Sequence, residues 1–389
     1  MSIAEIHRLG LRPGRAGAVW FACCPLLLAQ WFSVVQLHAI TIEVRRMCDH
    51  IGVCAAGDFF SDHPQALDTL GFSTKAFEPF ADNLLAIPSS PGWTATFTNP
   101  NTGKSASLIN LFVPSDTLII FAGGRDFDTD DTPAVNQVGA AGPGQANISL
   151  SRGQGVIVGS SAIDFSTWGG AIAFDTLSSG SPRNWHFDIH TPPAPGQTDF
   201  LTIALHELAH VFGFGTAPSF DNLVSGDQFQ GANTINLTGS TVSLGPNEDH
   251  WASGTTSPPY ADPPISALAA PLVLGRRRVL TPLDYAALAD IGWEVPDKLL
   301  GLHGDIDADG DIDGRDFLIW QRSVGTSGVG LLADADGSQM VDEYDLWLWQ
   351  SNYGRQVAGN QPLAAVPEPA TIMSTGMVAM ALLACRILK

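Results

Sequence analysis

The sequence predicts an α+β protein, in which a twisted mixed sheet with one prominent helix is followed by a small α-helical module. Three observations support this fold class. Short apolar runs alternate with Gly, Ser and Thr between residues 40 and 296, as in a mixed domain. The segment 196–215 has the apolar spacing of a helix. Residues 301–355 contain two copies of an acidic loop, each followed by a helical pattern.

Length and composition set the first limits. The chain has 389 residues, 45% of them hydrophobic and 15% charged, which is enough for one sizeable core and smaller appendages. The formal net charge of −20 argues against nucleic acid as a partner. Of the five cysteines, only Cys48 and Cys54 lie in the body of the chain. A small disulfide loop and two free thiols both fit this pair.

Residues 1–39 have the pattern of a secretory signal peptide. Arg8, Arg12 and Arg15 precede a long apolar run, and Ala39 ends a short segment suited to cleavage. A retained N-terminal membrane anchor is the alternative. The small residue at the end of the segment and the β-like stretch after it favour cleavage.

The next segments are assigned from their periodicity. The apolar spacing over 60–87 predicts a long amphipathic helix, either continuous or broken near Gly71. The stretch 107–127 is typical of strands around a turn, and the stretches 155–162 and 169–176 predict further strands.

The clearest helix lies within 196–215. Thr198 or Asp199 can cap its start, and Gly213 or Gly215 can end it.

A shorter helix is predicted within 281–293. Thr281 is expected to be its N-cap, Pro282 fits the first helical position and Gly292 provides the stop. The polar, Pro-containing stretch that follows marks the end of a domain spanning 40–296.

Two histidines in the clearest helix have the spacing of metal ligands. His206 and His210 lie one turn apart and project from the same face, so their imidazoles can hold one Zn²⁺. Glu207 can reach a water molecule at the metal and act as a general base. The alternative is a helix with two structural histidines.

This pattern, continued to Gly213, resembles the motif of the metzincin zinc peptidases. The resemblance implies a metzincin-like catalytic domain over 40–296, a twisted mixed sheet with an active-site helix. It also implies a zinc-dependent endopeptidase that hydrolyses peptide bonds of a protein or peptide substrate, with one catalytic Zn²⁺ and Glu207 as the catalytic base.

The third ligand departs from the short form of that motif. Its expected position holds Thr216, and a hydroxyl is a poor zinc ligand beside an available imidazole. Leishmanolysin-like members carry an insertion before a third histidine that is followed by tryptophan. That resemblance implies His250, followed by Trp251, as the third ligand beside His206 and His210. His186 and His190 are rivals, but they precede the helix.

Two further features surround the proposed metal. Asp249 or Glu248 can orient an imidazole. The clan places a methionine beneath the zinc, but the segment between His250 and the helix at 281–291 contains none. Leu268 or a neighbour is expected to form an apolar floor instead.

The segment 168–185 resembles the edge strand of matrixin-like metzincins. The resemblance implies that an extended peptide pairs with this strand, at Gly170, Ala171, Ile172 and Ala173. An ordinary sheet edge is the alternative.

The acidic repeat has a period of 29 residues, from Asp305 to Asp334. The loop 305–316 has the EF-hand pattern, with carboxylates at positions 1, 3, 5, 9 and 12 and glycine at position 6. Its expected calcium ligands are Asp305, Asp307, Asp309, Asp313 and Asp316, with Asp311 offering its backbone carbonyl. The loop 334–345 offers Asp334, Asp336, Ser338, Asp342 and Asp345. Gln339 replaces the glycine there, so the second site is expected to be weaker, and the module binds one or two Ca²⁺.

The segment 297–356 as a whole resembles a type I dockerin. The resemblance implies a paired EF-hand module that folds on calcium and docks onto a cohesin-like partner. A calcium-stabilised spacer without such a partner fits the same residues.

Residues 357–389 form a linker and a tail. The tail runs from "VPEP" through an apolar stretch to basic residues and resembles a PEP-CTERM sorting signal. The resemblance implies a tail that lies transiently in the membrane, is recognised by a sorting enzyme of exosortase type, and directs the protein to a bacterial cell surface or extracellular polysaccharide matrix. A plain transmembrane anchor is the alternative.

These observations lead to two hypotheses. The first is a secreted, surface-targeted zinc metallopeptidase, a hydrolase with a calcium-binding module. The second is a catalytically silent surface or matrix binding protein on a peptidase-like fold, suggested by Thr216 and by the missing methionine.

Overall fold

The structure is a computed structural model that describes residues 38–47, 58–82, 84–89, 93–127, 133–138, 140–141, 165 and 167–358. Residues 1–37 of the predicted signal peptide, Cys48, Cys54, the strand predicted at 155–162 and the predicted sorting tail from residue 359 lie outside this range. The described residues contain eight α-helices and a four-stranded mixed sheet, so the prediction of a mixed α/β protein is confirmed. No helix within them is long and apolar enough to cross a membrane.

The main sheet contains three parallel strands and one antiparallel strand at its end. In spatial order they are β2 (Thr41–Arg46), β6 (Thr117–Arg125), β9 (Gly169–Asp175) and β7 (Ala134–Val138). β7 follows β6 in the chain but pairs with β9, so the strand order does not follow the sequence.

The prediction that residues 170–173 form an edge strand open to a substrate is wrong. Gly170, Ala171, Ile172 and Ala173 lie in β9, which pairs with β6 on one side and with β7 on the other. Its backbone groups on both sides are therefore used within the sheet, and no peptide can add to it. Among the described strands, β7 forms the edge of the main sheet on this side.

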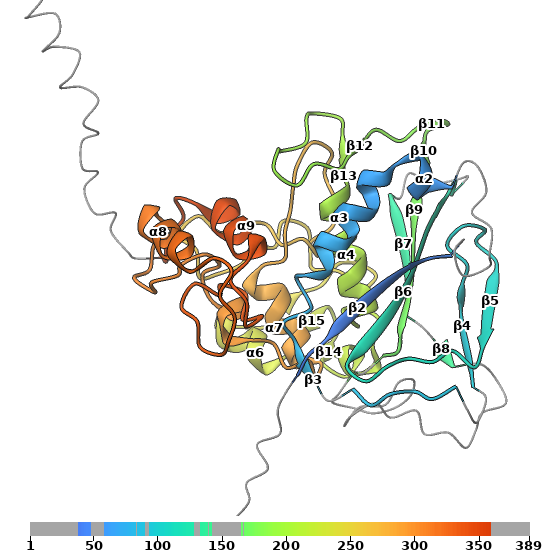
Figure 1. The fold of residues 1–389 in the computed structure, drawn as a ribbon, viewed down its shortest axis with the longest axis horizontal. Coiled ribbons are helices and arrows are strands. Elements are labelled where there is room, and N and C mark those ends of the chain that lie inside the picture. The colour runs from blue at the N-terminus through green and yellow to red at the C-terminus, as the bar shows by residue number, and fades with distance from the viewer. Residues whose placement is uncertain are drawn as a thin grey trace, which may run out of the picture. The chain divides into compact units, whose positions relative to one another are not determined.

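Side chains of β6 alternate between two cores. Leu118 and Ile120 belong to a large core with the helices, and Ile119 and Phe121 belong to a smaller core. Helices α3 (Pro64–Thr74) and α4 (Phe200–Val211) cover the first face, and the hairpin of β4 (Thr94–Thr98) and β5 (Ser105–Ile109) covers the second (Figure 1). Phe97 of β4 stacks on Phe121 with ring centroids 4.7 Å apart.

The clearest predicted helix is present as α4. Asp199 rather than Thr198 is its N-cap, since the Asp199 side chain accepts a hydrogen bond from the backbone N–H of Thr202. Every residue of α4 is buried. The helix ends before Gly213, whose φ of +102° favours a residue without a side chain.

The single long helix predicted over 60–87 is wrong. α2 (Phe59–Asp62) and α3 are separate helices, because Pro64 begins α3 and lacks the N–H that a continuous helix would need. α3 passes through Gly71 and ends at Thr74. The apolar spacing continues because Phe77 and Phe80 are buried in the core from a turn rather than from a helix.

The second predicted helix is α7 (Pro282–Asp290). Thr281 is its N-cap and forms a reciprocal capping box with Asp284. The remaining short elements are α5 (Pro218–Asp221), α6 (Ala232–Thr238), the 3-10 turn η1 (Asp297–Leu300), β1 (His38–Ala39), β3 (Ala81–Asp82), β8 (Ala140–Ala141), β10 (Leu177–Ser178), β11 (Ser181–Pro182), β12 (Trp185–His186), β13 (Thr198–Asp199), β14 (Val224–Ser225), β15 (Gln228–Phe229) and β16 (Val242–Ser243).

The acidic repeat folds into α8 (Gly314–Ser323) and α9 (Glu343–Asn352), each preceded by its loop. α9 packs against α3: Phe72 lies 5.4 Å from the Tyr344 ring and 5.5 Å from the Trp347 ring, between centroids. Lys75 at the end of α3 forms an ion pair with Asp342. The large hydrophobic core therefore continues from the α/β part into the repeat.

Candidate metal centre

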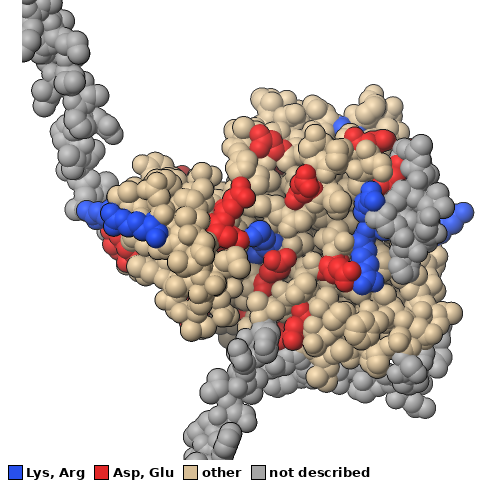
Figure 2. Space-filling model, viewed as in Figure 1, with Lys and Arg blue, Asp and Glu red and all other residues tan. Residues whose placement is uncertain are grey.

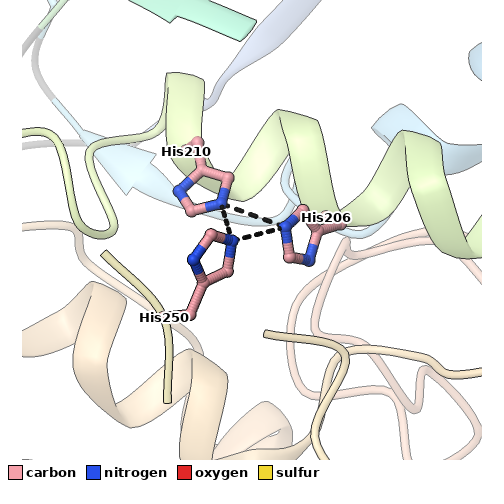
Figure 3. Close-up of side chains that lie close together, drawn as sticks. All are labelled: His206, His210 and His250. Carbon is pink, nitrogen blue, oxygen red and sulfur yellow. Dashed lines mark hydrogen bonds between the residues drawn. The ribbon is translucent and has the colours of Figure 1, made fainter. Parts of the chain in front are cut away.

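Three histidine side chains converge at one point of the structure (Figure 3). His206 and His210 come from α4, and His250 comes from a loop that faces the helix. The Nε2 atom of His206 lies 2.9 Å from that of His250, and the Nε2 atom of His210 lies 3.1 Å from each of the others. The three imidazoles thus form a compact group that could hold a metal ion.

The other ring nitrogen of each histidine has an oxygen partner. Nδ1 of His206 lies 2.9 Å from the carbonyl of Ala267, and Nδ1 of His210 lies 2.8 Å from the carbonyl of Phe214. Nδ1 of His250 lies 2.7 Å from a carboxylate oxygen of Asp249. Each oxygen can only accept, so Nδ1 carries the proton and Nε2 is left with a lone pair.

Three lone pairs that face one another repel unless a cation lies between them. A tetrahedral Zn²⁺ bound by nitrogen at ~2.0–2.1 Å holds its ligands about 3.3 Å apart, close to the observed separations. Burial, followed by the charges of the neighbouring imidazoles, lowers the pKa of His206 well below its usual value. Burial also lowers the pKa of His210 to about 4. Both rings are therefore neutral at pH 7, as metal binding requires.

Two glycines after α4 lie where a side chain would not fit. A side chain at Gly213 would collide with Phe165 and Ala217. A Cβ at Gly215, where φ is +65°, would lie 2.4 Å from the backbone oxygen of Asp249. Close backbone contact at this glycine is therefore what brings the segment that carries His250 next to the end of α4.

Thr216 occupies the position where the short motif has its third histidine. Its hydroxyl donates to the backbone carbonyl of His210 at 2.6 Å, so it closes the end of the helix. His186 and His190 lie outside the group: Nε2 of His186 contacts the carbonyl of Thr191, and Nε2 of His190 lies 3.6 Å from Glu343. Among the predicted alternatives, the structure brings only His250 to the helix histidines.

The segment after His250 forms the floor of the metal centre. Leu268 is fully buried, as expected for an apolar floor, but the contact with the histidines is made by its neighbour Ala267 through the backbone. Nothing in the sequence marks this carbonyl or that of Phe214, because every residue carries one. Of the two acidic residues predicted to orient an imidazole, Asp249 makes the contact.

The three histidines line a cavity of about 690 Å³. Glu207 lines this cavity and is 5% exposed, so it faces the centre from the same helix. Pro133, just before β7, and Ala134 and Val135 at its start also line this cavity. The sequence gives no signal for β7 as a cavity wall, since its alternation is typical of any strand.

The first acidic loop brings together Asp305, Asp307 and Asp309. Burial raises the pKa of Asp305 to about 6, and neighbouring carboxylates contribute to the rise. Gly310 has a φ of +93°, and its N–H donates to Asp305. Asp316 accepts three backbone N–H bonds and shapes the loop, and Asp313 caps α8. The backbone carbonyl of Asp311 stays a predicted ligand.

The second acidic loop brings together Asp334, Asp336 and Asp345, all of them buried. Burial raises the pKa of Asp345 to about 7 and, together with the Asp345 charge, raises that of Asp336 well above its usual value. Gln339 adopts the left-handed conformation of the missing glycine, with φ of +68°. Asp342 caps α9, and the Ser338 hydroxyl lies 3.4 Å from Asp334 at the edge of the group.

Acidic side chains are spread over the viewed face of the molecule, whereas Lys and Arg lie in small separate groups (Figure 2). This distribution agrees with the formal net charge of −20.

The chain was compared with models of protein families, with curated proteins and with solved structures. No family model, no curated protein and no solved structure matches it.

Proposed function

We propose that this protein is a secreted zinc-dependent endopeptidase with a metzincin-like catalytic domain. The observation that carries the proposal is the convergence of three imidazoles, each with its Nδ1 atom hydrogen-bonded to an oxygen, at a cavity that Glu207 also lines. His206, His210 and His250 would hold the metal. When bound, Zn²⁺ supplies Lewis-acid chemistry: it polarises a carbonyl group and makes a water molecule more acidic.

Glu207 performs the proton transfers. Its carboxylate takes the proton of the attacking water and passes it to the nitrogen of the leaving amine. The position of Glu207 directly after His206 on α4 supports this role, because the rigid helix fixes the carboxylate relative to the imidazoles.

The substrate binds in extended form along β7. Among the described strands, β7 and not β9 forms the edge of the sheet on this side, and its first residues line the cavity. A peptide that adds to this edge by strand pairing brings a backbone carbonyl to the centre whatever its side chains.

The acidic loops would hold one or two Ca²⁺. Carboxylates whose pKa is raised by burial and crowding are stabilised by a hard cation with oxygen ligands. The module packs against the catalytic domain through α9. A cohesin-like partner, and a sorting enzyme that acts on the tail to deliver the protein to a bacterial surface or matrix, are part of the same proposal.

The test compares Glu207→Gln with Glu248→Gln in a chain that keeps the module, because α9 shares the core of the catalytic domain. Glu207→Gln should bind zinc as the wild type does and cleave a fluorescent unfolded protein about 10²–10⁴-fold more slowly. Glu248, an exposed neighbour of the His250 loop, should tolerate the same change.

Full cleavage by Glu207→Gln would contradict the role of Glu207. A wild-type protein that binds zinc and cleaves no protein would contradict the proposed activity and favour the second hypothesis, a catalytically silent binding protein.

A further inference from the structure

Asp284 is a buried carboxylate on α7 that binds two separate chain segments. One oxygen, Oδ1, accepts from the indole Nε1 of Trp251 at 2.9 Å and from the hydroxyl of Ser266 at 2.5 Å. The other oxygen, Oδ2, accepts from the N–H and the hydroxyl of Thr281, both at 2.8 Å. Asp284 is 0% exposed, so its position is determined by these four donors.

The two oxygens have different tasks. The bonds of Oδ2 to Thr281 complete the capping box of α7. Helix capping does not require Oδ1. The bonds of Oδ1 instead join α7 to two segments that lead directly to the metal centre.

The first of these segments carries His250. Trp251 is the next residue, and its fully buried ring lies 4.9 Å from the Phe214 ring and 5.5 Å from the Phe229 ring. Its indole N–H has Asp284 as its partner in this apolar setting. Because packing and the hydrogen bond both hold the indole, the backbone of the adjacent His250 is held as well.

The second segment orients His206. Ser266 directly precedes Ala267, whose carbonyl accepts a hydrogen bond from Nδ1 of His206. The Ser266 hydroxyl also accepts from the N–H of Leu268 at 2.9 Å, so it holds the turn on both sides of that carbonyl. The N–H of Trp251 donates to the carbonyl of Leu268 at 3.0 Å, which joins the two segments.

We propose that Asp284 is the positioning residue of the metal centre. Its Oδ1 sets the place of His250 through Trp251 and the ring orientation of His206 through Ser266. Asp284 does not line the cavity and acts through these two segments. The inference rests on the proposed function only in that the three histidines hold zinc. Outer-shell partners of metal ligands typically contribute 10–100-fold to metal affinity, and this is the range expected for Asp284.

The test measures zinc dissociation constants by competition with a chromophoric chelator, in the full chain. Asp284→Asn is compared with Asp290→Asn on the same helix. Asp290 also accepts two backbone N–H bonds, from Asn233 and Thr234, but contacts neither segment of the metal centre. Asp284→Asn should raise the zinc dissociation constant about 10–100-fold, and Asp290→Asn should leave it unchanged.

Two milder variants keep the test decisive if Asp284→Asn does not fold. Trp251→Phe and Ser266→Ala each remove one donor to Oδ1, and each should weaken zinc binding and change the visible absorption of the cobalt-substituted protein. Wild-type affinity and an unchanged cobalt spectrum in both variants would overturn the inference. Equal losses in Asp284→Asn and Asp290→Asn would also overturn it, because they would show general destabilisation.

These readouts need no substrate. A wild-type chain that binds no zinc would overturn the proposed function itself. Zinc binding by the wild type, with unchanged affinity in Asp284→Asn, would overturn only the role of Asp284.

Discussion

Substitution of Gly215 by alanine separates the geometry of the metal centre from general stability. The new Cβ would lie 2.4 Å from the backbone oxygen of Asp249, whereas ordinary contacts begin at 3.4 Å. The Asp249 backbone must therefore withdraw by about 1 Å, and His250, the next residue, must move with it. Metal–ligand distances tolerate only about 0.2 Å, so the His250 imidazole would leave the centre.

Gly226 is the matched control. Its φ of +61° is close to the +65° of Gly215, but a Cβ there would meet nothing within 4 Å. Both alanine variants carry the same left-handed strain, roughly 1–2 kcal/mol, so urea unfolding of the metal-free proteins should show this loss in both. Any further loss in Gly215→Ala comes from the contact with Asp249. Only Gly215→Ala also displaces a ligand.

The assay is zinc affinity measured by chelator competition. Gly215→Ala should weaken binding by about 100-fold or more, beyond the usual loss of one outer-shell partner, and Gly226→Ala should bind as the wild type does. Equal zinc affinities in the two variants would refute the reasoning, because they would show that the contact with Asp249 does not place His250.

Two further predictions concern the calcium module. Trp347→Ala should lower the free energy of unfolding by about 3–5 kcal/mol, because the buried Trp347 ring packs on Phe72. Leu318 holds the equivalent position of the first repeat and is 45% exposed, so Leu318→Ala should lower it by less than about 0.5 kcal/mol. Urea unfolding measures both, and equal losses would contradict the packing of α9 on α3. Calcium should raise the urea midpoint more at pH 8 than at pH 5.5. Without a cation, the pKa of Asp345 is raised to about 7, so the protonated carboxyl stabilises the fold at low pH and this contribution is lost as pH rises through 7. At pH 5.5, calcium must therefore displace a proton in order to bind. A calcium-induced rise that is the same at both pH values would contradict this account.

Local signals in the sequence predicted the helices of the centre well. Asp199 and Thr281 are caps next to apolar periodic stretches, and both helices start where these caps predict. The prediction of a long helix over 60–87 was wrong because Pro64 starts a new helix, and because apolar residues after Thr74 are buried without being helical.

The non-local parts of the structure could not be predicted in the same way. The pairing of β7 with β9 joins strands that are separated along the chain, and nothing in either strand specifies the order of the sheet. The packing of Tyr344 and Trp347 on Phe72 was likewise hidden, because apolar residues on α9 are equally expected in the core of an independent module. The place of Asp284 between two segments depends on the tertiary fold alone.

The most direct test of the central claim is the zinc content of the purified full chain, measured by elemental analysis for the wild type, His250→Ala and His190→Ala. The account predicts about one zinc per chain in the wild type and in His190→Ala, whose exposed imidazole lies outside the centre, and loss of tightly bound zinc in His250→Ala. Zinc retained in full by His250→Ala, or absent from the wild type, would contradict it.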